Sequence, residues 1–234
     1  MGRCHVVIVE GPIGGGKTTM TRCLYQALGP RTLAQEEPVP ENGGNPYLDD
    51  YYRDPTRWSF TLQIHQLGMR FGQHQAAQWH ALRGAGHAIL DRSYHGDTCF
   101  ARLQRRRGLM TEREFKTYTI VYHEMTATIL KPTVCLRLLV TPEDCLRRVK
   151  QRMIAEEKRA CESAVDLDYL VDLNEEIGAL CGTLRGQGVV VWEIPWDVDL
   201  DAATQMSIAR SLAGRIEGLT IPDEFGALHG RTVG

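Results

Sequence analysis

The stretch HVVIVEGPIGGGKTT, residues 5–19, decides the fold of this chain. After His5 comes a run of apolar, β-branched residues from Val6 to Val9, which predicts a buried strand. The chain then turns through a glycine-rich segment into a predicted helix that begins near Lys17. A strand, a glycine-rich turn and a helix in this order are typical of a P-loop. The alternative is a glycine-rich turn with an exposed lysine, and the flanking strand and helix argue against it.

The residues of this loop suit the phosphates of a nucleotide. Glycines let backbone N–H groups approach an anion without Cβ clashes, and the positive end of the helix dipole points at the same anion. We expect Lys17 to reach the β- and γ-phosphates and the Thr18 hydroxyl to bind Mg²⁺. The predicted nucleotide-binding residues of the loop are Gly11, Gly14, Gly15, Gly16, Lys17, Thr18 and Thr19.

Length and composition predict an ordinary α/β protein. The 234 residues fit one domain, taken as 1–234, with a tail at 222–234 that carries no signal. A net charge of -2 and a hydrophobic share of 43% indicate no nucleic-acid or membrane partner. The seven cysteines form no CxxC pair and no metal-ligand spacing, so we expect reduced thiols and a cytoplasmic location. No apolar run predicts a signal peptide or a membrane span.

Beyond the loop, predicted helices and strands alternate, as in an α/β protein with a parallel sheet. Further strands are predicted at 32–36, 87–91, 133–140 and 188–194. Helices are predicted at 19–28, 55–82, 100–107, 112–130, 142–152, 168–185 and 201–216. Residues 40–50, PENGGNPYLDD, are rich in turn formers and predict a mobile loop over the site.

Charged residues follow two of the predicted strands. Glu36 and Glu37 come before a proline at the end of the second strand, and Asp91 and Arg92 follow the third. The carboxyl edge of a parallel sheet is where ligands bind, so these groups are placed for chemistry. We expect Asp91 to bind Mg²⁺, directly or through water, and Arg92 to pair with a phosphate or orient an acceptor hydroxyl. The alternatives are a solvated loop carboxylate for Glu37 and a strand-end cap for Asp91.

A basic helix follows the fourth predicted strand. Its sequence RRVKQR, residues 147–152, predicts a lid, about 147–165, that holds Arg148 and Arg152 over a triphosphate. A cationic helix that only faces solvent is the alternative. The other basic run, 102–107, is expected to be a solvated helix end.

Several motifs in order resemble the deoxynucleoside kinase family, from about residue 5 to 195. They are GPIGGGKT, EEPV, DPTRWSFTLQ, LDRSYHGDTCFA, the basic CLRRVKQR lid and DLDYL. The resemblance implies a P-loop kinase fold, a five-stranded parallel sheet flanked by helices, with a basic lid. It also implies Mg²⁺-assisted transfer of a γ-phosphate, from ATP or another nucleoside triphosphate, to a deoxynucleoside 5′-hydroxyl for nucleotide salvage. Family members dimerise, which here implies a homodimer through the helices that start at Pro55 and Glu112.

The same resemblance assigns roles to individual residues. Glu37 is similar to the family's general base, and Arg92 to the arginine that orients the 5′-hydroxyl. Lys17 and Asp91 take the phosphate-binding and metal-linked positions. The remaining substrate positions are Tyr52 and Glu157 for the sugar 3′-hydroxyl, Trp58 and Phe60 for the pocket wall, Gln63, Arg70 and Asp97 for the base edge, and Phe100 for packing on the base.

The predicted base-reading residues favour some nucleobases over others. A buried amide with an arginine–aspartate pair offers fixed donors and acceptors to adenine, guanine or cytosine. Thymidine-accepting relatives generally lack that pair, so we expect purine deoxynucleosides, with deoxycytidine possible. Two departures affect the lid: Ile154 stands where most relatives carry an arginine, and the segment from Glu157 to Tyr169 is longer.

Two other functions stay open at this point. A nucleoside monophosphate kinase would need cations for the acceptor phosphate, and Arg53, Arg57 and Arg70 could supply them. A nucleotide-binding subunit without catalytic activity is favoured only by the altered lid.

Overall fold

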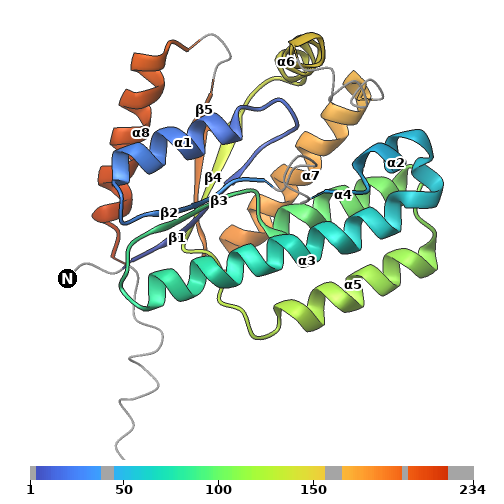
Figure 1. Ribbon diagram of the computed structural model, residues 1–234, viewed down its shortest axis with the longest axis horizontal. Coiled ribbons are helices and arrows are strands. Elements are labelled where there is room, and N and C mark those ends of the chain that lie inside the picture. The colour runs from blue at the N-terminus through green and yellow to red at the C-terminus, as the bar shows by residue number, and fades with distance from the viewer. Residues whose placement is uncertain (1–3, 38–44, 156–164, 197–199, 221–234) are drawn as a thin grey trace, which may run out of the picture.

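The computed structural model describes residues 4–37, 45–155, 165–196 and 200–220. Within these ranges helices and strands alternate along most of the chain (Figure 1). Their bounds are β1 Val6–Glu10, α1 Lys17–Leu28, β2 Leu33–Gln35, α2 Leu48–Arg53, α3 Pro55–Leu82, β3 Ala88–Asp91, α4 Tyr94–Arg106, α5 Glu112–Thr126, β4 Val134–Leu139, α6 Pro142–Ala155, α7 Leu167–Gly186, β5 Val190–Pro195 and α8 Ala202–Glu217.

The described strands form one five-stranded sheet in the order β2-β3-β1-β4-β5, and every neighbouring pair is parallel. Val7 of β1 pairs with Ile89 of β3 on one side and with Val134 of β4 on the other. All five residues of β1 are buried, as expected for a central strand covered on both faces. The predicted five-stranded parallel sheet is confirmed.

Helices cover both faces of the sheet. In Figure 1, α1 and α8 lie on one face, while α3, α4 and α7 lie on the other with α5 outside them. Successive residues of β1 serve opposite faces: Val7 and Val9 pack with Leu24 of α1, whereas Ile8 packs with Leu103 of α4. This alternation follows the two-residue period of a strand. Both layers are therefore fixed to the strand that leads into the P-loop.

Several of the predicted boundaries are wrong, including the end of the helix predicted at 112–130, which ends at Thr126. The helix expected at 100–107 begins at Tyr94, because the side chain of Ser93 caps it by accepting a hydrogen bond from the Gly96 N–H at 3.1 Å. Within the expected loop at 40–50, residues 48–50 are the first turn of α2, in which Asp49 and Asp50 favour a helix N-terminus. Residues 40–44 of that loop lie outside the described part of the chain.

The longest described helix, α3, begins as predicted at Pro55, and Asp54 caps it by accepting from the Arg57 N–H at 3.1 Å. It crosses one face of the molecule and carries a row of buried polar side chains. None of the described helices combines the length and the apolar character that a membrane span requires.

Candidate active site at the carboxyl edge of the sheet

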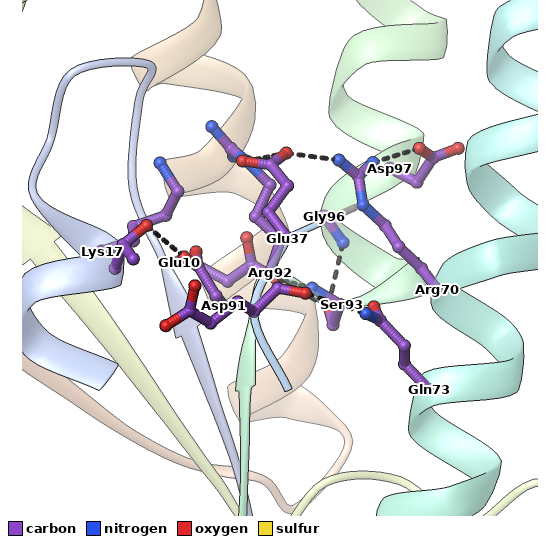
Figure 2. A network of polar contacts seen from close by, with 12 residues as sticks. Glu10, Lys17, Glu37, Arg70, Gln73, Asp91, Arg92, Ser93, Gly96 and Asp97 are labelled. Carbon is purple, nitrogen blue, oxygen red and sulfur yellow. Dashed lines mark hydrogen bonds and ion pairs between the residues drawn. The ribbon is translucent and has the colours of Figure 1, made fainter. Parts of the chain in front are cut away.

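Three adjacent strands bring distant parts of the sequence to one edge of the sheet. The P-loop follows β1, Arg92 follows β3, and Glu37 comes two residues after β2. Figure 2 shows Glu37 between Lys17 on one side and Arg70 on the other. The structure thus brings these residues together at the carboxyl edge of the sheet, as predicted.

The P-loop has the backbone that an anion cradle needs. Gly14 and Gly16 have φ angles of 77° and 78°, in the left-handed region that favours glycine. A Cβ on Gly16 would lie 2.5 Å from Nε1 of Trp196 and 3.0 Å from a guanidinium nitrogen of Arg148, so no larger residue fits without movement. The helix α1 starts at the next residue, Lys17, with its N-terminus at the loop.

Lys17 lies inside the loop and is 6% exposed. Its Nζ donates a hydrogen bond to the Pro12 carbonyl at 2.8 Å. Burial and, secondly, the nearby charge of Arg92 lower the pKa of Lys17 to about 8. A phosphate group would take the place of the carbonyl as partner and would favour the charged form of the lysine.

The two predicted metal-binding residues contact each other. The hydroxyl of Thr18 donates to Oδ2 of Asp91 at 2.5 Å. The other carboxylate oxygen of Asp91, Oδ1, is buried and has no hydrogen-bond partner within the described residues. Burial raises the pKa of Asp91, with Lys17 opposing. A cation or its water shell would satisfy this oxygen and keep the carboxylate charged.

Glu37 is held by two arginines. Oε1 of Glu37 accepts a hydrogen bond from Nη2 of Arg70 at 2.7 Å and lies 3.0 Å from Nε of Arg92. Its side chain is 35% exposed, while those of Arg70 and Arg92 are 6% and 2% exposed. Burial alone would raise the pKa of Glu37, but Arg92, Arg70 and Lys17 outweigh it and lower the pKa to about 2. The group is therefore an ionised, oriented carboxylate at neutral pH.

Arg92 has a strained backbone. Its φ of 69° makes it the one non-glycine residue in the described ranges with a positive φ. Nη1 of Arg92 donates to the carbonyl of Gly11 at 3.0 Å, and the guanidinium lies 4.8 Å from the ring centre of Phe100. Strain at a residue fixed by several contacts is common at functional sites.

Sequence reasoning missed the residue that supports this turn, Glu10. This fully buried carboxylate accepts from the Ser93 N–H at 2.9 Å and from its hydroxyl at 2.6 Å. A Cβ on Gly96 would lie within 2.6 and 2.8 Å of Glu10 carboxyl atoms, so glycine is required there. The available signal was an acidic residue that ends an otherwise apolar strand.

The predicted base-reading residues lie on α3 and α4. Arg70 is ion-paired with Asp97 as well as with Glu37. Asp97 is fully buried, and its Oδ2 accepts from the hydroxyl of Tyr118 at 2.6 Å. Phe100 lies beside both arginines, with its ring centre 5.9 Å from the Arg70 guanidinium. Tyr118 is a second residue that sequence reasoning missed, because it was assigned only to an apolar helix face.

Gln63 lies on the same helix, two turns before Arg70. It is 3% exposed, and its side-chain oxygen has no hydrogen-bond partner in the described part of the chain. This unpaired atom agrees with a role in binding a ligand.

The other predicted substrate residues lie in α2, near the N-terminus of α3 or outside the described residues. Trp58 stacks on Tyr47 with ring centres 5.7 Å apart, near the N-terminus of α3, and Tyr52 lies in α2. Phe60 packs against the cluster that contains Tyr118. Glu157 lies outside the described residues, so its role stays a prediction.

Arg148 of the basic helix α6 contacts the P-loop. Nη1 of Arg148 donates to the carbonyl of Gly14 at 3.1 Å, whereas Arg147 pairs with Asp144 at 3.0 Å. Arg152 is half-buried, and Ile154 is 87% exposed at the end of the helix. Arg148 thus lies against the P-loop, while residues 156–164 of the predicted lid lie outside the described residues.

Comparisons with known proteins agree with this geometry. The family model described as deoxynucleoside kinase matches residues 7–215. A deoxyadenosine kinase of Dictyostelium discoideum is 31% identical over 222 residues, covering 94% of this chain and 84% of the relative. A deoxyadenosine/deoxycytidine kinase of Bacillus subtilis (strain 168) is 35% identical over 150 residues, 63% of this chain and 65% of the relative.

The fold also has a solved counterpart. The structure of deoxyadenosine kinase from M. mycoides with bound dATP superposes with a TM-score of 0.71 at 22% identity. The superposition covers 90% of this chain and 99% of that protein. At this identity the likeness concerns the fold.

Proposed function

This chain belongs to the deoxynucleoside kinase family, and from that premise we propose that it transfers the γ-phosphoryl group of a nucleoside triphosphate to the 5′-hydroxyl of a deoxynucleoside. The product is the 5′-monophosphate, as nucleotide salvage requires. The observation that carries the proposal is Glu37, an ionised carboxylate held by Arg70 and Arg92 at the sheet edge beside the P-loop.

The reaction needs a base for the proton of the attacking hydroxyl. We assign that role to Glu37, because a carboxylate at this edge can accept the proton as the 5′-oxygen forms its bond to the γ-phosphorus and the bond to the leaving diphosphate breaks. Arg92 points its guanidinium at the same carboxylate and orients the hydroxyl. Release of Arg70 or Arg92 from Glu37 on substrate binding would raise the pKa of Glu37 and make it a stronger base.

The donor side is made by the P-loop and α6. We assign the β- and γ-phosphates to Lys17, to the backbone from Gly11 to Thr19 and to Arg148, with Arg152 added when the lid closes. Support comes from the buried Lys17 ammonium, from the helix N-terminus behind it and from the Arg148 contact with the loop. ATP is the donor we favour.

Mg²⁺ fits beside the P-loop. When bound, the ion neutralises charge on the transferred phosphoryl group. Thr18 and the unpaired oxygen of Asp91 would hold it, together with phosphate oxygens and water.

Asp91→Asn is expected to raise the Mg²⁺ concentration needed for half-maximal turnover by about 10- to 100-fold, since it removes one negative charge from the ion's surroundings. A Mg²⁺ titration at fixed ATP measures it. The control is Asp201→Asn, which keeps the N-cap of α8 intact because asparagine caps helices equally well. Equal Mg²⁺ dependence in wild type and Asp91→Asn would contradict the assignment.

On the acceptor side we propose a deoxynucleoside, with purines favoured and deoxycytidine possible. Arg70, Asp97 and Gln63 would contact the base, and Phe100 would pack on it. Tyr52, Trp58 and Glu157 would surround the sugar. The named relatives, deoxyadenosine and deoxyadenosine/deoxycytidine kinases, support this range of acceptors.

An acceptor panel tests the proposed function. ATP and Mg²⁺ are offered with the four deoxynucleosides and, separately, with their 5′-monophosphates, and ADP formation is followed. We expect turnover with deoxyadenosine or deoxyguanosine and little with thymidine. Turnover confined to monophosphates would indicate a nucleoside monophosphate kinase, and tight ATP binding without transfer would indicate a non-catalytic subunit.

We also propose that the chain forms a homodimer through α3 and α5. Both helices carry exposed apolar side chains: Met69 and Trp79 on α3 are 37% and 50% exposed, and Ile120 on α5 is 54% exposed. Sedimentation at micromolar concentration should give twice the mass of one chain. The substitution Ile120→Glu should lower the measured mass toward that of a single chain. A wild-type protein that sediments as a single chain would contradict the dimer.

A further inference from the structure

The side chain of Gln66 on α3 is buried without a partner. The residue is 4% exposed, and neither its amide nitrogen nor its amide oxygen has a hydrogen-bond partner among the residues the structure describes. Buried amides are paired in most proteins, and one that is unpaired at both atoms needs an explanation. Nothing in the sequence motifs assigns a role to this residue.

The register of α3 turns Gln66 toward the candidate active site. Residues three and four apart lie on the same helix face, so Gln63, Gln66 and Arg70 form one row. The contacts of Arg70 and of Gln73, one turn farther along α3, show which way this face points. Arg70 is ion-paired with Glu37 and Asp97, and Gln73 donates to the carbonyl of Glu36 at 2.9 Å. Figure 2 shows Arg70 and Gln73 extending from α3 toward the sheet edge.

A second glutamine of the same helix shows how a structural amide differs. Gln78 is 8% exposed, and its Oε1 accepts a hydrogen bond from the Leu130 N–H at 2.6 Å. It ties α3 to the segment before β4. Gln66 makes no such bond within the described ranges, so its amide loses its hydration and gains no hydrogen bond from the protein in exchange. A ligand in the site would supply the missing partners.

We propose that Gln66 binds the N7 edge and Gln63 the N1 edge of a 6-aminopurine, so that adenine is the preferred base. The inference rests on the proposed function and names the base that this same site selects. The oxygen of Gln63 is unpaired as well, so the row presents two buried amides one turn apart. Arg70 and Asp97 remain paired with each other beside them.

Adenine is the nucleobase that suits two amides. An amide offers a donor and an acceptor in one plane, and it pairs with an edge that offers an acceptor and a donor. The 6-amino group of adenine has two hydrogens, one beside N1 and one beside N7, so each edge presents that pattern. Cytosine has only one such edge. Guanine presents two adjacent acceptors, N7 and O6, where the second amide would need a donor.

The test combines a protein variant with a substrate analogue. 7-Deaza-2′-deoxyadenosine lacks the N7 acceptor and keeps the rest of the base. For wild type we expect kcat/KM to be about 10- to 100-fold higher for deoxyadenosine than for the analogue, as for one bidentate base contact. In Gln66→Leu, kcat/KM for deoxyadenosine should fall to within about twofold of kcat/KM for the analogue in the same variant. Gln66→Met serves if the leucine variant is insoluble.

Thermal unfolding without substrate separates binding from structure. Gln66→Leu should keep or raise the unfolding temperature, because leucine removes an unpaired amide from the interior. The control Gln78→Leu should lower it, because the Leu130 N–H loses its acceptor, and should leave the ratio of the two substrates unchanged. Lower stability in Gln66→Leu with an unchanged substrate ratio would overturn the proposal.

The substrate measurements distinguish a wrong proposed function from a wrong role of Gln66. If wild type phosphorylates no deoxynucleoside, the proposed function is wrong. If wild type phosphorylates deoxynucleosides but does not distinguish deoxyadenosine from its 7-deaza analogue, or prefers deoxyguanosine, only the role of Gln66 is wrong.

Discussion

Glu37→Gln is expected to lower kcat about 10²- to 10⁴-fold, the range that a general base contributes. Glutamine has nearly the same shape and still accepts a hydrogen bond from Arg70, but it cannot take the proton of the 5′-hydroxyl. Because a proton acceptor acts in the chemical step, KM for the deoxynucleoside should change much less than kcat. Steady-state kinetics with ATP in excess measures both values.

The neighbouring residue gives a matched control. Glu36 is half-exposed and pairs with Arg22, with Nε of Arg22 2.7 Å from its carboxylate, on the outside of the site. Glu36→Gln should keep kcat within about twofold, as expected for a surface ion pair. Unfolding curves of both variants show whether either one is still folded. If Glu37→Gln is folded and retains kcat, Glu37 is not the base.

Lys17→Met is expected to lower kcat/KM for ATP about 10²- to 10³-fold, the cost of removing one preorganised charge from a transition state. Methionine keeps the length of the side chain and removes the ammonium that donates to the Pro12 carbonyl. The control is Lys116→Met on the exposed face of α5. Activity equal to wild type in the Lys17 variant would contradict the P-loop assignment.

The pH dependence of nucleotide binding follows from the same lysine. Phosphate favours charged Lys17, which without phosphate predominates only below its lowered pKa of about 8. The dissociation constant of ATP should therefore rise as pH increases above 8, and in Lys17→Met that dependence should vanish. Calorimetric titrations of wild type and Lys17→Met with ATP, from pH 7 to 9.5, measure this dissociation constant.

Local signals in the sequence predicted the centre of the fold. The run from Val6 to Val9 and the glycines after it need only strand propensity and backbone sterics, so the strand and the P-loop are where they were expected. The positions of Glu37 and Arg92 followed from one further rule, that parallel strands end at the same edge. The meeting of these residues was thus predictable without any contact being known.

What the sequence did not reveal depends on contacts between distant elements. Tyr118 looks like one of several apolar residues on α5 until the packing of α5 on α4 places its hydroxyl on Asp97. Glu10 is recognised as a support only when Ser93, 83 positions later, is seen to donate to it. Gln66 stands out only because its surroundings lack a partner within the described residues, a property that no sequence pattern encodes.

The site also balances charge in a way that single motifs do not show. Three buried cations, Lys17, Arg70 and Arg92, lie near the carboxylates of Glu37, Asp91 and Asp97. Ion pairs join Arg70 to Glu37 and to Asp97, and Arg92 to Glu37 (Figure 2). Each cation is thus desolvated and oriented before any ligand arrives. Such preorganisation is the main way that proteins stabilise phosphoryl transfer.

The most direct measurement is the fate of a labelled γ-phosphate. Wild-type protein is given [γ-³²P]ATP, Mg²⁺ and either 2′-deoxyadenosine, its 5′-monophosphate or 2′,5′-dideoxyadenosine, which lacks the 5′-hydroxyl. The proposed function predicts label in the 5′-monophosphate with deoxyadenosine and none with the 5′-deoxy analogue. Label found in a diphosphate with the monophosphate as acceptor, or in no acceptor at all, would contradict it.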